Sequence, residues 1–205
     1  MSQNRTSARV RRAGGRRVAA VLGAAALCLA VLAACSSDPE PASSPKVPKG
    51  FEVPSGVTLT DAGSTVAVGK TATVVYDPGG AATAVSVRVD RIAKGSIKDF
   101  RFFSLDESSR KATPYYVRIT ATNRGPAGLG GSSLPVYAHT ASNTLYPPNE
   151  LVGTFKPCPD ARLPKSFLAG STAKICLIYL LPRGEKLETI DIQPGAEKDA
   201  IHVEP

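Results

Sequence analysis

Alternation of apolar and polar residues with a period of two is the feature that most constrains the fold of this chain. In residues 84–90 three valines alternate with polar side chains, and residues 115–122 repeat the pattern with larger side chains. Such alternation, rich in β-branched residues, is typical of a strand with one buried face. No segment keeps a helical period, although residues 104–111 could form one or two turns. The sequence therefore predicts an all-β chain.

Further candidate strands are spread over the rest of the sequence. The stronger ones are 71–76, 134–140, 174–181 and 187–193, and the weaker ones are 57–60 and 201–204. Turn-forming residues at 77–80 and 182–184 separate some of these runs. Seven or so short strands in a domain of about 150 residues favour a two-sheet antiparallel β-sandwich.

The beginning of the chain is typical of an export signal. Arginines precede the first acidic residue, and the uncharged apolar run 18–34 follows them. The run ends in Leu32-Ala33-Ala34-Cys35, which looks like a lipobox. We expect a signal peptidase to recognise Leu32, Ala33 and Ala34, and diacylglycerol to be attached to the sulfur of Cys35. Two acyl chains hold a protein stably on a membrane.

Two other interpretations of the leader stay open. The apolar run could be retained as a transmembrane anchor, or the protein could be cut near Ala34 and released. Paired arginines suggest the twin-arginine pathway, but the residues after them fit Sec export better. The lipobox favours a protein exported and anchored to the outer face of a bacterial cell membrane.

The sequence divides into three parts. Residues 1–34 are the expected signal peptide, 35–55 the lipidated cysteine with a linker, and 56–205 the sandwich domain. The linker carries five prolines among serines and charged residues, which is too polar for a core. We expect it to be disordered and to hold the domain away from the lipid.

The net charge gives little support for binding nucleic acid. The whole chain has a formal charge of +8, but six of its 25 basic residues are the leader arginines. Their removal leaves 19 basic against 17 acidic residues, a charge of about +2. A domain this close to neutrality lacks the basic surface that nucleic acid requires.

Two cysteines remain in the domain, Cys158 and Cys176, and in an exported protein they most simply form a disulfide. No cofactor or metal is expected, because the only histidines, His139 and His202, are far apart in the sequence. The Gly-x-Ser-x-Gly motif of serine hydrolases is absent. We therefore expect no enzyme; a hydrolase would need His139 beside a carboxylate and a hydroxyl in a cleft.

The candidate strand 175–181 is apolar on both faces, whereas a strand in a β-sandwich normally has one solvent-exposed, polar face. Residues 151–171 could cover the second face, held there by the disulfide. Alternatively, Ile178 and Leu180 form an exposed apolar surface that binds a partner. The covering segment is the simpler explanation.

Aromatic residues give a second hint of a binding surface. Phe100, Phe102 and Phe103 surround Arg101, and Tyr146 precedes two prolines. Aromatic residues near arginine are common in interfaces. A core without tryptophan needs phenylalanine as well, so we expect the phenylalanines in the core and treat Tyr146 as an equal candidate for a loop contact.

Several segments together resemble a known family. They are 69–74 (GKTATV), 85–87 (VSV), 116–123 (YVRITATN), 168–171 (LAGS) and 179–184 (YLLPRG). This order resembles the immunoglobulin-like domain of unknown function in lipoproteins of Gram-positive bacteria, which is similar to a secreted immunoprotective antigen of mycobacteria. The resemblance covers residues 66–193. It implies an antiparallel immunoglobulin-like β-sandwich with no catalytic residues to carry over.

These observations predict a lipid-anchored envelope protein with a monomeric, non-catalytic domain that binds a protein partner or has an accessory role. One alternative is an envelope lipoprotein that binds a small ligand between loops near residues 125–134. An envelope hydrolase is a further, weaker alternative.

The lipobox makes a prediction about the mature protein. Mass spectrometry of the protein isolated from membranes should find Cys35 as the first residue, carrying acyl chains on its sulfur. A mature N-terminus elsewhere, or an unmodified Cys35, would contradict the anchor.

Overall fold

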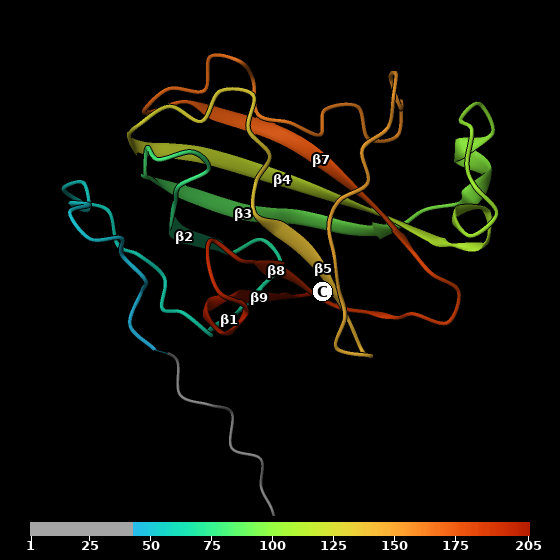
Figure 1. The fold of residues 1–205 in the computed structure, drawn as a ribbon, viewed down its shortest axis with the longest axis horizontal. Helices are drawn as coiled ribbons and strands as arrows, with labels where there is room; N and C mark the ends of the chain where they lie inside the picture. Colours follow the sequence, from blue (N-terminus) through green and yellow to red (C-terminus); the bar gives the residue numbers. More distant parts are fainter. Residues whose placement is uncertain (1–42) are drawn as a thin grey trace, which may run out of the picture. The chain divides into compact units, whose positions relative to one another are not determined.

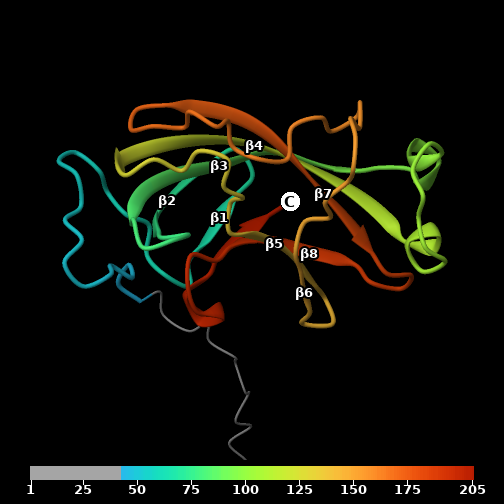
Figure 2. The same cartoon turned by 45° about the horizontal axis from the view of Figure 1, so that its top comes forward.

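The computed structural model of the protein describes residues 43–205, so the leader and the lipobox lie outside the described residues. The described residues form two stacked β-sheets (Figures 1 and 2). One sheet has the order β1 (Thr65–Ala67), β9 (Ile201–Glu204), β8 (Leu187–Ile192), β5 (Val136–Thr140) and β6 (Leu145–Tyr146). The other has the order β2 (Thr71–Tyr76), β3 (Thr83–Lys94), β4 (Thr113–Pro126) and β7 (Thr172–Leu181). The predicted all-β sandwich is confirmed.

The strand predictions are mostly confirmed. Strand β2 has the predicted bounds, and β3 and β4 are longer than expected. The weak candidate 57–60 is wrong: it forms no strand, although the Thr60 amide donates to the Thr73 carbonyl of β2 at 2.8 Å. Strand β1 was missed because it has only three residues. It pairs in parallel with β9, whereas the other described strand pairs are antiparallel.

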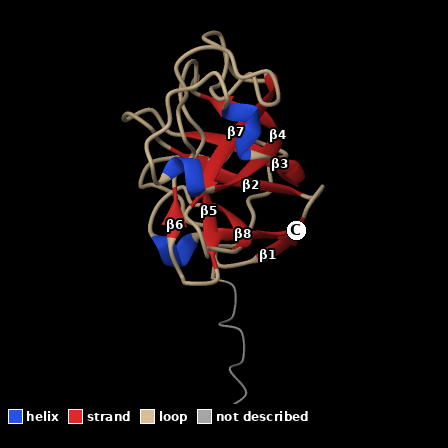
Figure 3. Cartoon of the chain, turned by 90° about the vertical axis from the view of Figure 1, so that its right-hand side faces the viewer, coloured by secondary structure: helices blue, strands red, loops and turns tan. Residues whose placement is uncertain are grey.

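Helical structure in residues 43–205 is limited to short 3-10 helices, drawn in blue in Figure 3. They are Ile97–Phe100, Ser109–Lys111 and Glu197–Asp199. The second lies at the end of the segment where one or two turns were expected. None of the described helices is long and apolar enough to cross a membrane.

The first described residues lie against the sandwich. Ser43 and Ala62 exchange two backbone hydrogen bonds of 2.9 Å, and Ala62 is buried. The intervening residues, which belong mostly to the predicted linker, are largely exposed and form no strand. The earlier part of that linker lies outside the described residues.

The main core lies between the two sheets. The three valines of β3 that predicted its buried face are completely buried, and the isoleucines of β8 belong to the same cluster. Tyr179 of β7 reaches across the core, and its hydroxyl donates to the carbonyl of Val136 in β5 at 2.9 Å. This bond ties the two sheets together at a side chain that has no exposed surface.

A second, smaller core covers the outer face of β7. Cys176 and Ile178 of β7 pack there with Phe100 and Phe155, whose rings stack with centroids 4.5 Å apart. Ile178 is only 3% exposed, so the alternative in which it belongs to an exposed binding surface is wrong, and the favoured interpretation of a covered face is confirmed. The covering segment explains its burial, and the loop that carries Phe100 adds to the cover. Leu180 is half-buried against the same cluster.

The predicted disulfide between Cys158 and Cys176 is present, and it joins the covering segment to β7. The same segment and Asn149, just before it, also cover the free edge of this strand. The Asn149 amide donates to the Ile178 carbonyl, the Asn149 side chain accepts from the Leu180 amide, and the Cys176 amide donates to the Asp160 carbonyl. An edge strand paired in this way cannot recruit a strand from another chain.

Removing the disulfide should destabilise the domain while leaving the fold intact. The bond closes a loop with a sequence separation of 18, and such a loop contributes about 3 kcal/mol by restricting the unfolded chain. Urea denaturation of the Cys158→Ala/Cys176→Ala variant should show a loss of that size. The unsubstituted protein under reducing conditions is the control. A loss of less than about 1 kcal/mol in the free energy of unfolding in both cases would contradict stabilisation by the disulfide.

Candidate functional site

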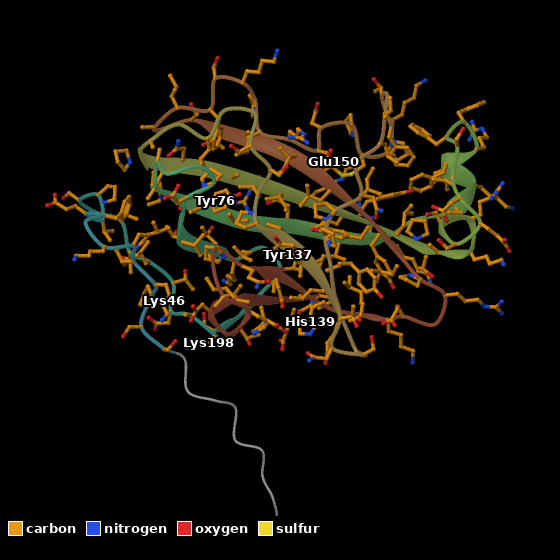
Figure 4. The ribbon with its side chains drawn as sticks, viewed as in Figure 1. Lys46, Tyr76, Tyr137, His139, Glu150 and Lys198 are labelled. Carbon is orange, nitrogen blue, oxygen red and sulfur yellow. A yellow bond between two sulfur atoms is a disulfide. The ribbon has the colours of Figure 1, made fainter. Side chains whose placement is uncertain are left out.

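The two histidines that are far apart in the sequence lie on two strands of the five-stranded sheet that flank the same third strand. His139 is on β5 and His202 on β9, with β8 between them (Figure 4 labels His139). Their ring centroids are 6.2 Å apart. The expectation that distance prevents them from acting together is wrong, because strands distant in the sequence are adjacent in this sheet.

Asp191 of β8 joins the two histidines. Its two carboxylate oxygens contact the Nδ1 atoms of His139 and His202, each at 2.9 Å. The Thr189 hydroxyl also donates to this carboxylate, at 2.6 Å. Although the Asp191 side chain is only 1% exposed, each of its oxygens has a partner.

Strand register explains why these side chains meet. Asp191 pairs directly with His202, while His139 pairs with Thr189, two residues earlier on β8. Side chains on one face of a sheet that are opposite or diagonal to each other lie within contact distance. The neighbours of Asp191, Ile190 and Ile192, face the main core, so Asp191 faces outward.

The cluster shifts the acid–base properties of its members. The hydrogen bond to Asp191 raises the pKa of His202 above the ordinary 6.5, although partial burial opposes this change. Burial raises the pKa of Asp191, but hydrogen bonds from His202 and Thr189 outweigh it and lower the pKa below 3.8. Both shifts favour the charged forms of the two groups.

The same geometry does not assemble a serine-type hydrolase. His139 has the required carboxylate on Nδ1, but its Nε2 contacts the Asn143 side chain at 2.9 Å, where a triad needs a hydroxyl. The Thr189 hydroxyl donates to the carboxylate instead. Within residues 43–205, no hydroxyl is hydrogen-bonded to either imidazole. The cluster is therefore suited to holding protons or a cation.

A shallow depression of about 550 Å³ lies over the histidines. It is lined by Thr65, His139, Glu188, Thr189, His202, Glu204 and Pro205. The two glutamates are exposed and place negative charge at its rim. The depression is open to solvent, so small ions can reach the imidazoles.

A second feature is an exposed apolar surface above the second core. Phe102 is 83% exposed and Val152 is 98% exposed, and both line one concave region of about 530 Å³. The Arg101 guanidinium lies 4.5 Å from the centre of the Phe102 ring. Phe100 is buried and Phe103 is half-buried in the second core, as expected for core phenylalanines. Phe102 lies between them in the sequence but is exposed, so the core expectation is wrong for this residue.

The other predicted binding residues are partly used inside the domain. Tyr146 is half-buried in β6 and packs against the main core. The loop proposed for a small ligand is filled: Leu129 and Leu134 are buried, and a Cβ at Gly130 would lie 2.0 Å from the Lys165 carbonyl oxygen. The backbone at Gly130 therefore leaves no space for a ligand, whereas nothing lies within 4 Å of a Cβ at Gly131.

No family model and no curated protein matches the chain. Among solved structures, the chain is similar to MPT63, a secreted protein from Mycobacterium tuberculosis. The two chains are 14% identical, with a TM-score of 0.48, and the match covers 69% of this chain and 96% of MPT63.

The sequence contained a weak signal for the histidine cluster. Asp191 stands between two isoleucines in a predicted strand, so it had to lie on the outer face. His139 and His202 also alternate with apolar residues in their strands. Finding the cluster nevertheless required the strand order, because only that order brings the three outer positions together.

The pKa shifts predict a pH-dependent contribution to stability. Because the pKa of His202 is raised on folding, this residue adds to the free energy of unfolding. The gain is complete below pH 6.5 and is lost as the pH rises through the pKa of His202 in the folded protein. Because the pKa of Asp191 is lowered on folding, this residue adds a gain in the free energy of unfolding that is complete above pH 3.8 and is lost on acidification. The His202→Gln variant should therefore be most destabilised, relative to the unsubstituted protein, between pH 3.8 and 6.5.

Chemical denaturation across this pH range measures the difference. The difference in the free energy of unfolding between the variant and the unsubstituted protein should decrease as the pH rises above the pKa of His202 in the folded protein. Parallel stability curves across the whole range would contradict the coupling between His202 and Asp191.

Proposed function

We propose that the protein is a lipid-anchored envelope protein whose sandwich domain binds another envelope protein. The docking surface consists of Arg101, Phe102, Val152 and Lys156, here called the Phe102 surface. The observation that carries this proposal is the exposure of Phe102 and Val152 at one place on the domain. The leader and lipobox support the location, and the lack of a catalytic set in the sequence supports a binding role.

Because these two side chains are exposed, a partner that buries them gains hydrophobic stabilisation. Burial of a phenylalanine or valine side chain is worth about 1.5–3 kcal/mol each. Phe102 lies between Arg101 and Phe103 in the sequence, and Phe103 is anchored in the second core. A partner that covers the two residues gains this energy from a surface that the rest of the domain leaves open.

The base of the surface is fixed before any partner binds. The ring of Phe155 contacts those of Phe100, Phe103 and Tyr116, with centroids 4.5 to 5.6 Å apart. The disulfide holds the covering segment to β7 three residues after Phe155. A preorganised surface binds more tightly because less conformational entropy is lost on association.

The charges around the surface indicate the chemistry of the partner. Arg101 and Lys156 are exposed and positively charged. The nearby Asp99 carboxylate is engaged internally, since it accepts from the Tyr116 hydroxyl and from the Ser96 amide. We expect a protein partner that offers an apolar pocket for Phe102 flanked by carboxylates.

Site-specific crosslinking in intact cells tests this function. A photo-crosslinking phenylalanine analogue at position 102 should capture one discrete protein. The adduct should fall at least about tenfold in an Arg101→Glu/Val152→Glu variant, because each change opposes a contact worth about 1 kcal/mol or more. Both residues are exposed, so the variant should keep the stability of the unsubstituted protein.

Leu168 provides the matched control position, because it is also apolar and is 63% exposed but does not line the Phe102 surface. The same analogue at position 168 should not capture that protein. Identical capture of abundant neighbours from both positions would reject the proposal. Crosslinks from position 102 to lipid alone would also reject it and would indicate a membrane contact instead.

A further inference from the structure

We propose that His139, Asp191 and His202 form a binding site for a divalent cation of the zinc type on the outer face of the five-stranded sheet. Each residue offers one ligand atom, and these atoms all lie within 4.8 Å of one another. The site is separate from the Phe102 surface and does not depend on the partner proposed there.

The donor set matches the chemistry of zinc. Two imidazole nitrogens with one carboxylate oxygen are common zinc ligands, whereas magnesium and calcium prefer oxygen ligands alone. Three protein ligands leave the fourth tetrahedral position open. Both histidines line the open depression, from which water or a donor atom of another molecule could supply the fourth ligand.

The ligand atoms must move closer together to bind one ion. Bonds of about 2.0–2.1 Å to a tetrahedral zinc ion place neighbouring ligand atoms roughly 3.3 Å apart. Each Asp191 oxygen lies 2.9 Å from one Nδ1 atom, Oδ2 from that of His139 and Oδ1 from that of His202, and the three ligand atoms all lie within 4.8 Å of one another. The two imidazoles must approach each other by rotation, and the His202 side chain has the freedom to do so because it is one-third exposed, at 33%.

Neighbouring side chains hold the ligands in place. The Thr189 hydroxyl donates to the Asp191 carboxylate, and the Asn143 side chain contacts Nε2 of His139. Partners that orient metal ligands in this way typically contribute 10–100-fold to affinity. Thr189 and Asn143 are therefore positioning residues, and neither supplies a ligand in this proposal.

The charges around the site favour a cation. Glu188 and Glu204 line the same depression, and Asp191 contributes a buried negative charge. A neighbouring depression that also includes His202 is lined by Lys46, Lys198 and Asp199. Counted over both depressions together with Asp191, four carboxylates against two ammonium groups leave the region attractive to a divalent ion.

Protons compete with the metal for the same atoms. Zinc binds the unprotonated imidazole, so the affinity should fall as the pH drops and the imidazoles gain protons. The bound ion would bridge β5, β8 and β9, because each strand supplies one ligand. Zinc should therefore also raise the unfolding temperature.

Calorimetric titration of the whole protein with Zn²⁺ tests the site. The protein is purified in detergent without a polyhistidine tag and is treated with a chelator first. We expect one equivalent of zinc to bind. In the His139→Gln/His202→Gln variant the affinity should fall by more than about 100-fold, because losing a ligand costs more than losing a residue that orients one.

The Glu188→Gln variant is the matched control, because Glu188 lines the depression but supplies no ligand. It should keep one equivalent of zinc with an affinity within about tenfold of the unsubstituted protein, as the loss of a single nearby charge is a modest electrostatic change. Zinc binding that survives in the double histidine variant would overturn the proposal, because the ion would then be held by other groups, such as free thiols.

A second measurement avoids substitutions altogether. The chain has only two histidines, so nuclear magnetic resonance of the imidazole nitrogens reports directly on both. One equivalent of zinc should shift the resonances of both rings together. Unchanged ring resonances after that addition would overturn the proposal and leave Asp191 as a hydrogen-bonded support for the two histidines.

Discussion

Burial of strand β7 on both faces is the constraint on which much of the domain depends. Its odd-numbered residues from Ile175 to Leu181 enter the main core, while Cys176 and Ile178 enter the second core. A strand with two apolar faces needs a covering layer, because a two-sheet sandwich buries only one face of each strand. The loops at 97–105 and 151–158 form that layer, and the disulfide fixes it to the strand, whereas Leu163 and Phe167 of the predicted covering segment pack in the main core.

This covering layer has a direct consequence for function. Phe100, Phe103 and Phe155 occupy the second core, so the loops that carry them are held firmly where they leave it. Phe102 and Val152 lie on these loops and remain exposed. The interaction that completes the fold on this side therefore also presents the surface to which we assign partner binding.

The opposite sheet shows how much of a site depends on topology. Alternation in the sequence was enough to predict β5 and β8 and, as a weaker candidate, β9. It could not predict that β8 lies between the other two, because β8 and β5 are separated in the sequence by β6, the covering segment and β7. Without the strand order, nothing in the sequence indicated that the two histidines contact the same carboxylate.

The sequence by itself determined the all-β class, most of the strands, the disulfide pair and the expectation of a lipid anchor. These follow from local chemistry: side-chain alternation, two cysteines in a domain that we expect to be exported, and an apolar leader that precedes Cys35. Tertiary structure decided that Ile178 is covered, that Phe102 is exposed, and that two histidines meet at Asp191. These outcomes depend on contacts between residues far apart in the sequence, which strand order and register fix only when the sheets form.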